Sequence, residues 1–152
     1  MMKGEILVMS EAEKDAVETA LDTKKGWYID LEHSGEKVVS SPLIFDKVVY
    51  FTTFTPSAST ESSGDLCFTQ GSGTARLYAL AYKTGNAVFY FSGDSNLTKE
   101  DRCLTIGSGI PSQPVIIVTK TGGHVLVGTE GGVHSQSIMS GQDINRYYWK
   151  QN

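Results

Sequence analysis

The residues best suited to chemistry in this sequence are its two cysteines, Cys67 and Cys103. Neither belongs to a C-x-x-C pair and no histidines cluster beside them, so their spacing does not indicate a metal or redox site. In a secreted protein the two thiols could join in one disulfide, whereas in a cytosolic protein they would be two buried free thiols. The spacing alone leaves both alternatives open.

Three histidines, His33, His124 and His134, are the candidate bases. A serine hydrolase needs a base beside an activated serine, which often lies on a Gly-x-Ser-x-Gly turn. The sequence contains no such turn, and the glycines around Ser108 lack its spacing. Surface or hydrogen-bonded histidines are therefore the expected interpretation. We predict no catalytic residue, no bound cofactor and no enzymatic activity.

Acidic side chains gather in residues 94–101, where oxygen-bearing residues alternate as they do in a calcium-binding loop. The match is incomplete. Lys99 occupies the sixth position, where the sharp turn needs glycine, and Thr105 occupies the twelfth, where a bidentate glutamate belongs. We therefore expect a solvated acidic loop and predict no metal site.

Length and charge bound the class of protein. The chain has 152 residues, 39% of them apolar, and a formal net charge of −4. These values suit a single domain, residues 1–152, with a hydrophobic core of its own. Lysines and arginines are scattered, so nucleic acid is not an expected partner. The longest apolar runs, such as residues 115–118, are far shorter than the roughly 20 residues of a membrane-spanning helix, so no membrane insertion is expected.

One helix is expected near the N-terminus, where Ser10 and Glu13 form a capping box and Lys24-Lys25-Gly26 forms the C-terminal stop signal. Residues 1–25 are thus predicted to be a short helix or an irregular lead-in. Beyond them, alternating β-branched and aromatic residues predict strands joined by turns and by long polar loops. The strands are predicted at residues 27–31, 42–45, 47–54, 76–82, 87–91, 114–119, 124–128 and 146–150, with the loops at residues 55–73 and 92–102.

These strands form an imperfect internal repeat. Each copy opens with Pro42 or Pro114, continues through an apolar strand and a hairpin into two more strands, and reaches a Thr84-Gly85 or Ser140-Gly141 turn before its last strand. Four strands per copy are typical of a β-propeller blade. We therefore predict an all-β fragment of a propeller, with about two four-stranded blades and a leading strand. A β-sandwich with coincidental turn spacing is the alternative.

One hairpin carries a known signature. Residues 79–89, ALAYKTGNAVF, resemble the quinoprotein-type propeller repeat Ala-x-Asp-x-x-Thr-Gly-x-x-x-Trp. Ala81 replaces the aspartate, and Phe89 replaces the tryptophan that docks neighbouring blades. The signature implies a fold rather than an activity. A quinone-dependent dehydrogenase would also be expected to carry adjacent cysteines and a calcium-bound carboxylate, and Cys67 and Cys103 are not adjacent.

A wider resemblance runs in order from about residue 26 to residue 150. The matching pieces are GWYIDL, GEKVVSSP, VYFTTFTP, Cys67, LYAL and GIPS. Together they resemble the C-terminal propeller of PilY-type type IV pilus biogenesis factors and tip adhesins. This resemblance implies an exported bacterial protein of the periplasm, outer membrane, cell surface or pilus tip, with further blades and a signal peptide upstream.

The resemblance also implies a function. It predicts a non-enzymatic module for pilus biogenesis, surface attachment and twitching motility, which binds minor pilins or a surface ligand through propeller loops such as residues 55–73. Export favours a disulfide between Cys67 and Cys103. The family's calcium loop and large adhesive region have no match here, so calcium regulation is not carried over. The alternative is a quinoprotein-like scaffold for protein–protein interaction in the bacterial envelope. Open blade faces would also allow self-association.

Overall fold

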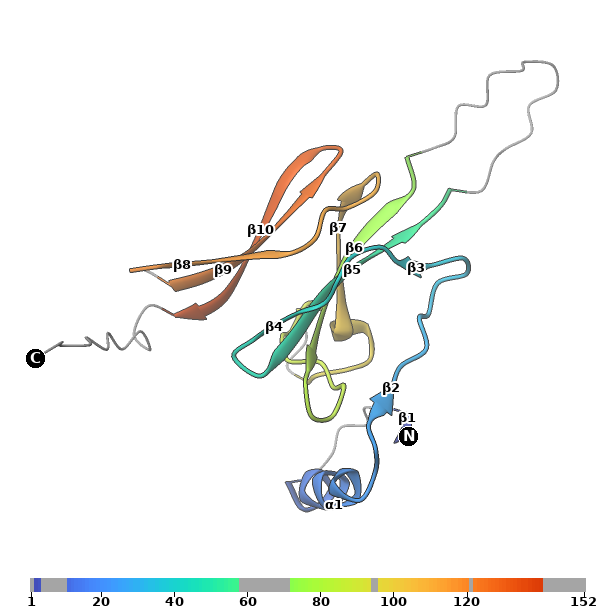
Figure 1. Cartoon of the computed structure of the whole chain (residues 1–152), viewed down its shortest axis with the longest axis vertical. Coiled ribbons are helices and arrows are strands. Elements are labelled where there is room, and N and C mark those ends of the chain that lie inside the picture. Colours follow the sequence, from blue (N-terminus) through green and yellow to red (C-terminus); the bar gives the residue numbers. More distant parts are fainter. Residues whose placement is uncertain (1, 4–10, 58–71, 94–95, 121, 141–152) are drawn as a thin grey trace, which may run out of the picture.

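Strands dominate the computed structural model, which describes residues 2–3, 11–57, 72–93, 96–120 and 122–140. They form two antiparallel sheets and one short parallel pair (Figure 1). The expected all-β character is confirmed at this level. The elements are β1 (Met2–Lys3), α1 (Glu11–Asp22), β2 (Trp27–Tyr28), β3 (Lys37–Val38), β4 (Leu43–Phe45), β5 (Val48–Thr55), β6 (Thr74–Ala81), the 3-10 helix η1 (Glu100–Arg102), β7 (Cys103–Ser108), β8 (Val115–Thr119), β9 (Gly122–Thr129) and β10 (Gly132–Ser140).

The first sheet is an antiparallel meander around the central strands β5 and β6. β3 and β4 pair with opposite ends of β5, at Phe54 and at Tyr50, and so make one interrupted edge strand. β7 pairs with the other side of β6 and forms the second edge. The strands therefore lie beside one another in the order in which they occur along the chain.

A two-residue turn joins β4 to β5, as the sequence predicts. Asp46 and Lys47 both have positive φ, at 46° and 64°. Positive φ at both central residues defines a type I′ turn, whose twist matches that of the strands it connects. This turn pairs Phe45 with Val48 and thereby sets the register of the whole hairpin.

The second sheet repeats the first three strands of this meander. Its order is β10-β9-β8, and β8 corresponds to β4, β9 to β5 and β10 to β6. The prolines that open the two copies, Pro42 and Pro114, directly precede β4 and β8. The fourth strand predicted for the second copy, residues 146–150, lies outside the described residues.

Two predicted strands are wrong in extent. Residues 87–91 form only an isolated bridge, Leu80↔Ala87, because Phe89 and Phe91 leave the sheet edge and pack against the core. The edge of β6 is taken instead by β7, which the sequence analysis did not predict. The predicted strand 27–31 is also shortened to β2, which pairs in parallel with β1.

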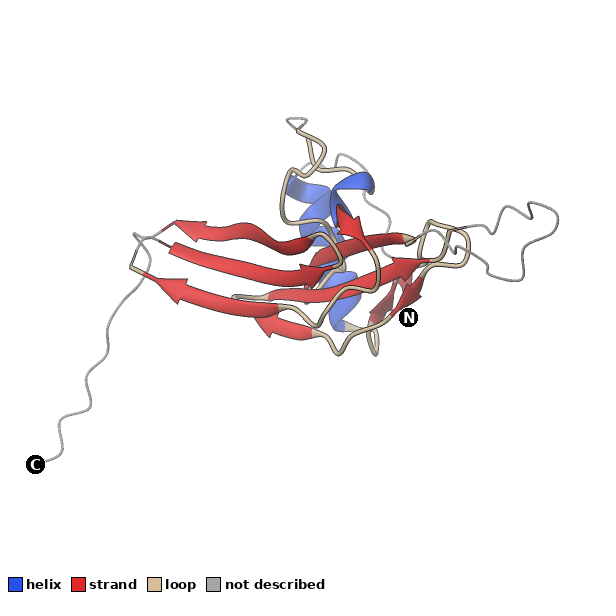
Figure 2. Cartoon of the chain, turned by 90° about the horizontal axis from the view of Figure 1, so that it is seen from above, coloured by secondary structure: helices blue, strands red, loops and turns tan. Residues whose placement is uncertain are grey.

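The core lies between the two sheets. The first sheet contributes Tyr50 and Leu77, and the second contributes Val125 and Val127, all at most 2% exposed. Seen from above, the longer strands lie roughly along one axis (Figure 2). The helix expected near the N-terminus is present as α1. Among the described residues, no helix is long and apolar enough to span a membrane.

Candidate functional site

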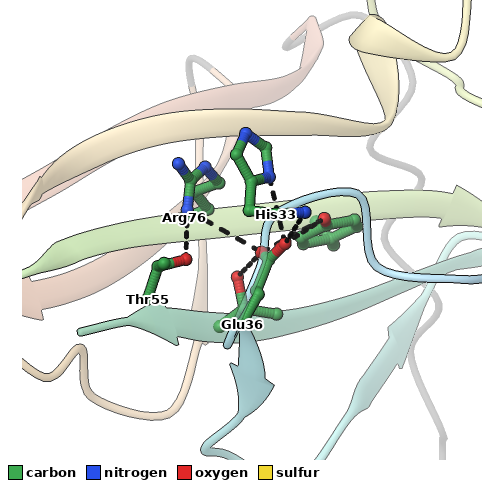
Figure 3. A network of polar contacts seen from close by, with 6 residues as sticks. His33, Glu36, Thr55 and Arg76 are labelled. Carbon is green, nitrogen blue, oxygen red and sulfur yellow. Dashed lines mark hydrogen bonds and ion pairs between the residues drawn. The ribbon is translucent and has the colours of Figure 1, made fainter. Parts of the chain in front are cut away.

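A buried carboxylate, that of Glu36, ties the segment before β3 to the first sheet (Figure 3). It accepts hydrogen bonds from the hydroxyl of Thr53 on β5 and from that of Tyr78 on β6, the latter at 3.2 Å to Oε1 and 3.3 Å to Oε2. The backbone N–H of His33 also donates to it, and His33 Nδ1 lies 3.1 Å from Oε2. One side chain is thereby bound to three separate elements of the chain.

Arg76 supplies the positive charge of this network. Its Nη1 lies 3.9 Å from Glu36 Oε1 and donates a hydrogen bond to Thr55 Oγ1 at 2.7 Å. Burial by itself raises the pKa of Glu36, but the hydrogen bonds from Thr53 and His33 outweigh burial and hold that pKa below its ordinary value. A carboxylate that stays ionised and fully engaged acts as an anchor and is poorly suited to proton transfer.

Sequence reasoning missed Glu36, although one signal for it was present. Arg76 is the only charged residue in β6, whose other positions are Thr, Ala, Leu or Tyr. A charged residue within an apolar strand needs a buried partner of opposite charge. The sequence does not indicate which of the many acidic residues fills that role.

Cys103 lies beside this network. It opens β7, is half-buried, and pairs in register with Tyr78. Burial is the main reason why the pKa of the Cys103 thiol is raised, so the thiol stays neutral and is a weak nucleophile. Burial likewise raises the pKa of Tyr78, whose hydroxyl remains a donor. Cys67 lies outside the described residues, so the disulfide between Cys67 and Cys103 stays a prediction.

The three histidines do not converge. His33 contacts Glu36, and His124 Nδ1 lies 3.4 Å from the hydroxyl of Ser135 across the β9–β10 pair. His134 faces the first sheet, and its Nε2 is buried without a hydrogen-bond partner in the part of the chain that the structure describes. Within those same residues, no three His, Cys, Asp or Glu side chains come together as a metal site would require.

An indole docks the leading segment on the first sheet. Trp27 donates a hydrogen bond from Nε1 to the carbonyl oxygen of Tyr82 at 2.8 Å. Its ring covers Gly85 in the turn after β6, and a Cβ built on Gly85 would lie 2.7 Å from Trp27 Cε3. Gly85 also has a φ of +71°, a left-handed conformation that side chains disfavour. The Thr84-Gly85 turn therefore needs glycine both for its backbone and for the ring.

Gly85→Ala is expected to lower the free energy of unfolding by about 2 kcal/mol, because it adds left-handed strain and pushes Trp27 off the turn. Urea unfolding followed by circular dichroism measures the change. Gly131→Ala is the matched control, since Gly131 has open space around its Cβ position and is expected to unfold as the wild type does. Equal midpoints for Gly85→Ala and wild type would show that the indole does not dock there.

Two serines hold equivalent places in the two repeat copies. The Oγ of Ser40 accepts a hydrogen bond from the backbone N–H of Thr52 on β5, at 3.0 Å. The Oγ of Ser112 accepts one from the N–H of Gly128 on β9, at 2.9 Å. Thr52 Oγ1 in turn donates to the carbonyl of Ser112 at 3.0 Å and so binds the first sheet to the linker that enters the second. The repeat thus extends from strand order to individual hydrogen bonds.

The polar loop before β7 is anchored by one of its own carboxylates. Asp101 is fully buried, which corrects the expectation of a solvated acidic loop. Its Oδ1 accepts a hydrogen bond from the N–H of Ser92 at 2.7 Å, and its Oδ2 accepts bonds from the N–H and the hydroxyl of Thr98 at 2.8 and 3.0 Å. Burial opposes ionisation, but these bonds dominate and lower the pKa of Asp101 to about 2.

The lowered pKa predicts acid lability. Asp101 stabilises the fold fully above the pKa that it has when unfolded, near 4, and the stabilisation of about 2 kcal/mol is lost as the pH falls toward 2. Asp101→Asn is therefore expected to be less stable than wild type at pH 7, with a gap that narrows in acid. Unfolding midpoints of wild type and Asp101→Asn between pH 7 and pH 2 measure the difference in stability. Glu100→Gln is the control, because Glu100 is the exposed neighbour of Asp101. A gap that is independent of pH would contradict the assignment.

The described residues thus offer anchors, a docked indole and inter-sheet hydrogen bonds, all of which suit a rigid scaffold. Comparison of the chain with family models, with curated proteins and with solved structures found no match.

Proposed function

We propose that the chain is a segment of a β-propeller and serves as a non-enzymatic assembly and adhesion module of the type IV pilus. The docking of Trp27 on the Thr84-Gly85 turn carries the propeller assignment, and the pilus assignment rests on the resemblance to PilY-type propellers. In the quinoprotein-type signature that residues 79–89 resemble, a tryptophan docks neighbouring blades. Trp27 joins the leading segment to the first sheet in this way, as the outer strand of a preceding blade would.

The sheets favour a propeller over the alternative of a β-sandwich for two reasons. Each sheet consists of strands that are consecutive in the sequence, as in a blade, whereas sandwiches commonly use Greek-key connections between sheets. The outward positions of a sandwich are polar. The second sheet instead exposes Val115, Ile117 and Val133 on its outward side.

The chemistry of the described groups supports binding over catalysis. Glu36 is engaged on all sides, and Cys103 is a poor nucleophile both as a buried neutral thiol and in the predicted disulfide. The contact between Ser135 and His124 lies on an open sheet face, at a distance longer than a normal hydrogen bond to a hydroxyl. We therefore assign binding of minor pilins or of a surface ligand to the propeller loops of an exported protein, with residues 55–73 as the main contact.

The test uses the source organism, which the resemblance implies is a piliated bacterium. Deleting the gene is expected to reduce surface pili, adhesion and twitching, and the wild-type chain in its natural context is expected to restore them. A variant in which residues 57–66 are replaced by a Gly-Ser linker of equal length, expressed at the same level, is expected to fail. Full restoration by that variant would exclude the loop as the contact, and normal pili after gene deletion would overturn the pilus function.

A scaffold of the bacterial envelope is the second candidate. The same Trp27 contact favours it, because the signature implies a fold and leaves the partner open. If deletion of the gene leaves pili and adhesion intact but disrupts another envelope complex, the scaffold is the better assignment.

A further inference from the structure

Each sheet leaves exposed apolar side chains on the face turned away from the core. On the first sheet, the face turned away from the core carries Val38 and Ile44, which are 52% and 65% exposed, together with half-buried Val49 and Phe51. We call this the leading face. The rest of this face is covered by the chain itself, since Thr53, Tyr78 and Leu80 lie on it and are at most 3% exposed, whereas Val38 and Ile44 remain in solvent.

The trailing face is the outward side of the second sheet. Val115 pairs with Leu126 and Ile117 with His124, so these side chains lie on the side opposite to the buried Val125 and Val127. The neighbouring strand β10 adds Val133, which is 71% exposed. Contiguous exposed apolar side chains of this kind mark interaction surfaces.

The repeat relates these two faces to an interface that the chain already forms. Ile44 and Val49 pair in the first sheet as Ile116 and Val125 pair in the second. Ile116 and Val125 belong to the core between the sheets. The leading face therefore corresponds to the side of the second sheet that packs on the first.

The trailing face has the complementary correspondence. Leu43 and Tyr50 pair in the first sheet as Val115 and Leu126 pair in the second. Tyr50 is a buried member of the core between the sheets. The trailing face therefore corresponds to the side of the first sheet that receives the second. The exposed apolar residues of the two faces thus correspond to the two halves of the internal interface.

We propose that the chain binds a second copy of itself head to tail, with the leading face of one copy on the trailing face of the next. Such a heterologous contact joins unlike surfaces, so it leaves one free face of each kind and adds further copies until a ring closes. The inference rests on the repeat and is independent of the pilus function. In a longer chain, further repeat units would pack on these two faces and block the contact between copies. The association is therefore predicted for the 152-residue chain alone.

Two charge substitutions, one on each face, test the polarity of this contact. In sedimentation velocity, the wild-type chain is expected to form dimers and larger species as its concentration rises. Ile44→Lys blocks the leading face and Val133→Asp blocks the trailing face, so each variant alone is expected to associate at least tenfold more weakly. An equal mixture of the two is expected to form dimers and nothing larger, since only one intact pair of faces remains.

Tyr90→Lys is the control, because Tyr90 is 56% exposed and lies in the loop after β6, outside the strands that form the two faces. Circular dichroism checks that each variant folds, and Val38→Lys with Val115→Glu is the second pair should one of the first fail to fold. A wild-type chain that stays monomeric, a single variant that associates as the wild type does, or a mixture that stays monomeric would each overturn the proposal.

Discussion

Glu36→Gln is expected to lower the free energy of unfolding by about 3 kcal/mol, because it leaves the mostly buried guanidinium of Arg76 without its carboxylate. The amide also offers only one acceptor oxygen where Thr53, Tyr78 and the His33 N–H all donate to the carboxylate. Equilibrium unfolding in urea at pH 7 measures the loss. The expected loss is a large fraction of the roughly 5–15 kcal/mol that separates the folded from the unfolded state of a typical domain.

Two further variants isolate the role of the charge. Glu130→Gln removes an exposed carboxylate and is expected to leave stability within about 0.5 kcal/mol of wild type. Adding Arg76→Met to Glu36→Gln removes the unpaired charge and is expected to recover part of the loss. If Glu36→Gln unfolds like Glu130→Gln, the carboxylate does not anchor the segment before β3.

Leu77→Ala is expected to cost about 3 kcal/mol, because Leu77 is completely buried in the core that the two sheets share. Since both sheets pack on this core, hydrogen exchange of the most protected amides should accelerate equally in β6 and in β9. That equality distinguishes one cooperative unit from two sheets that unfold separately.

Ile44→Ala is the matched control for this prediction. Ile44 lies on the leading face and is 65% exposed, so its truncation is expected to cost well under 1 kcal/mol. Acceleration confined to β5 and β6 in Leu77→Ala would mean that the second sheet does not depend on the shared core.

The sequence predicted those elements that local pattern determines. The helix near the N-terminus and the hairpins β4–β5 and β8–β9 follow from capping signals, alternation and short turns. Local pattern failed at the outer edge of β6. Residues 87–91 and β7 are both apolar enough to be strands, and only pairing with β6 decides that β7 takes most of the edge.

The site residues were harder to predict because their contacts are distant in the sequence. The Thr84-Gly85 turn was recognised, but nothing local shows that the ring of Trp27 covers it. Glu36 and Asp101 look like ordinary surface carboxylates by type, and their burial depends on donors from Tyr78 and Ser92 that the fold brings to them.

The central claim is that a docked leading segment is followed by two stacked copies of one unit. A nuclear Overhauser spectrum of the 152-residue chain tests this claim most directly. We expect cross-peaks between the indole ring of Trp27 and the α protons of Gly85, and between the methyl groups of Leu77 or Ile106 and those of Val125 or Val127. If the indole shows no contact with Gly85 and the two sets of methyl groups show none with each other, the stacked arrangement is wrong.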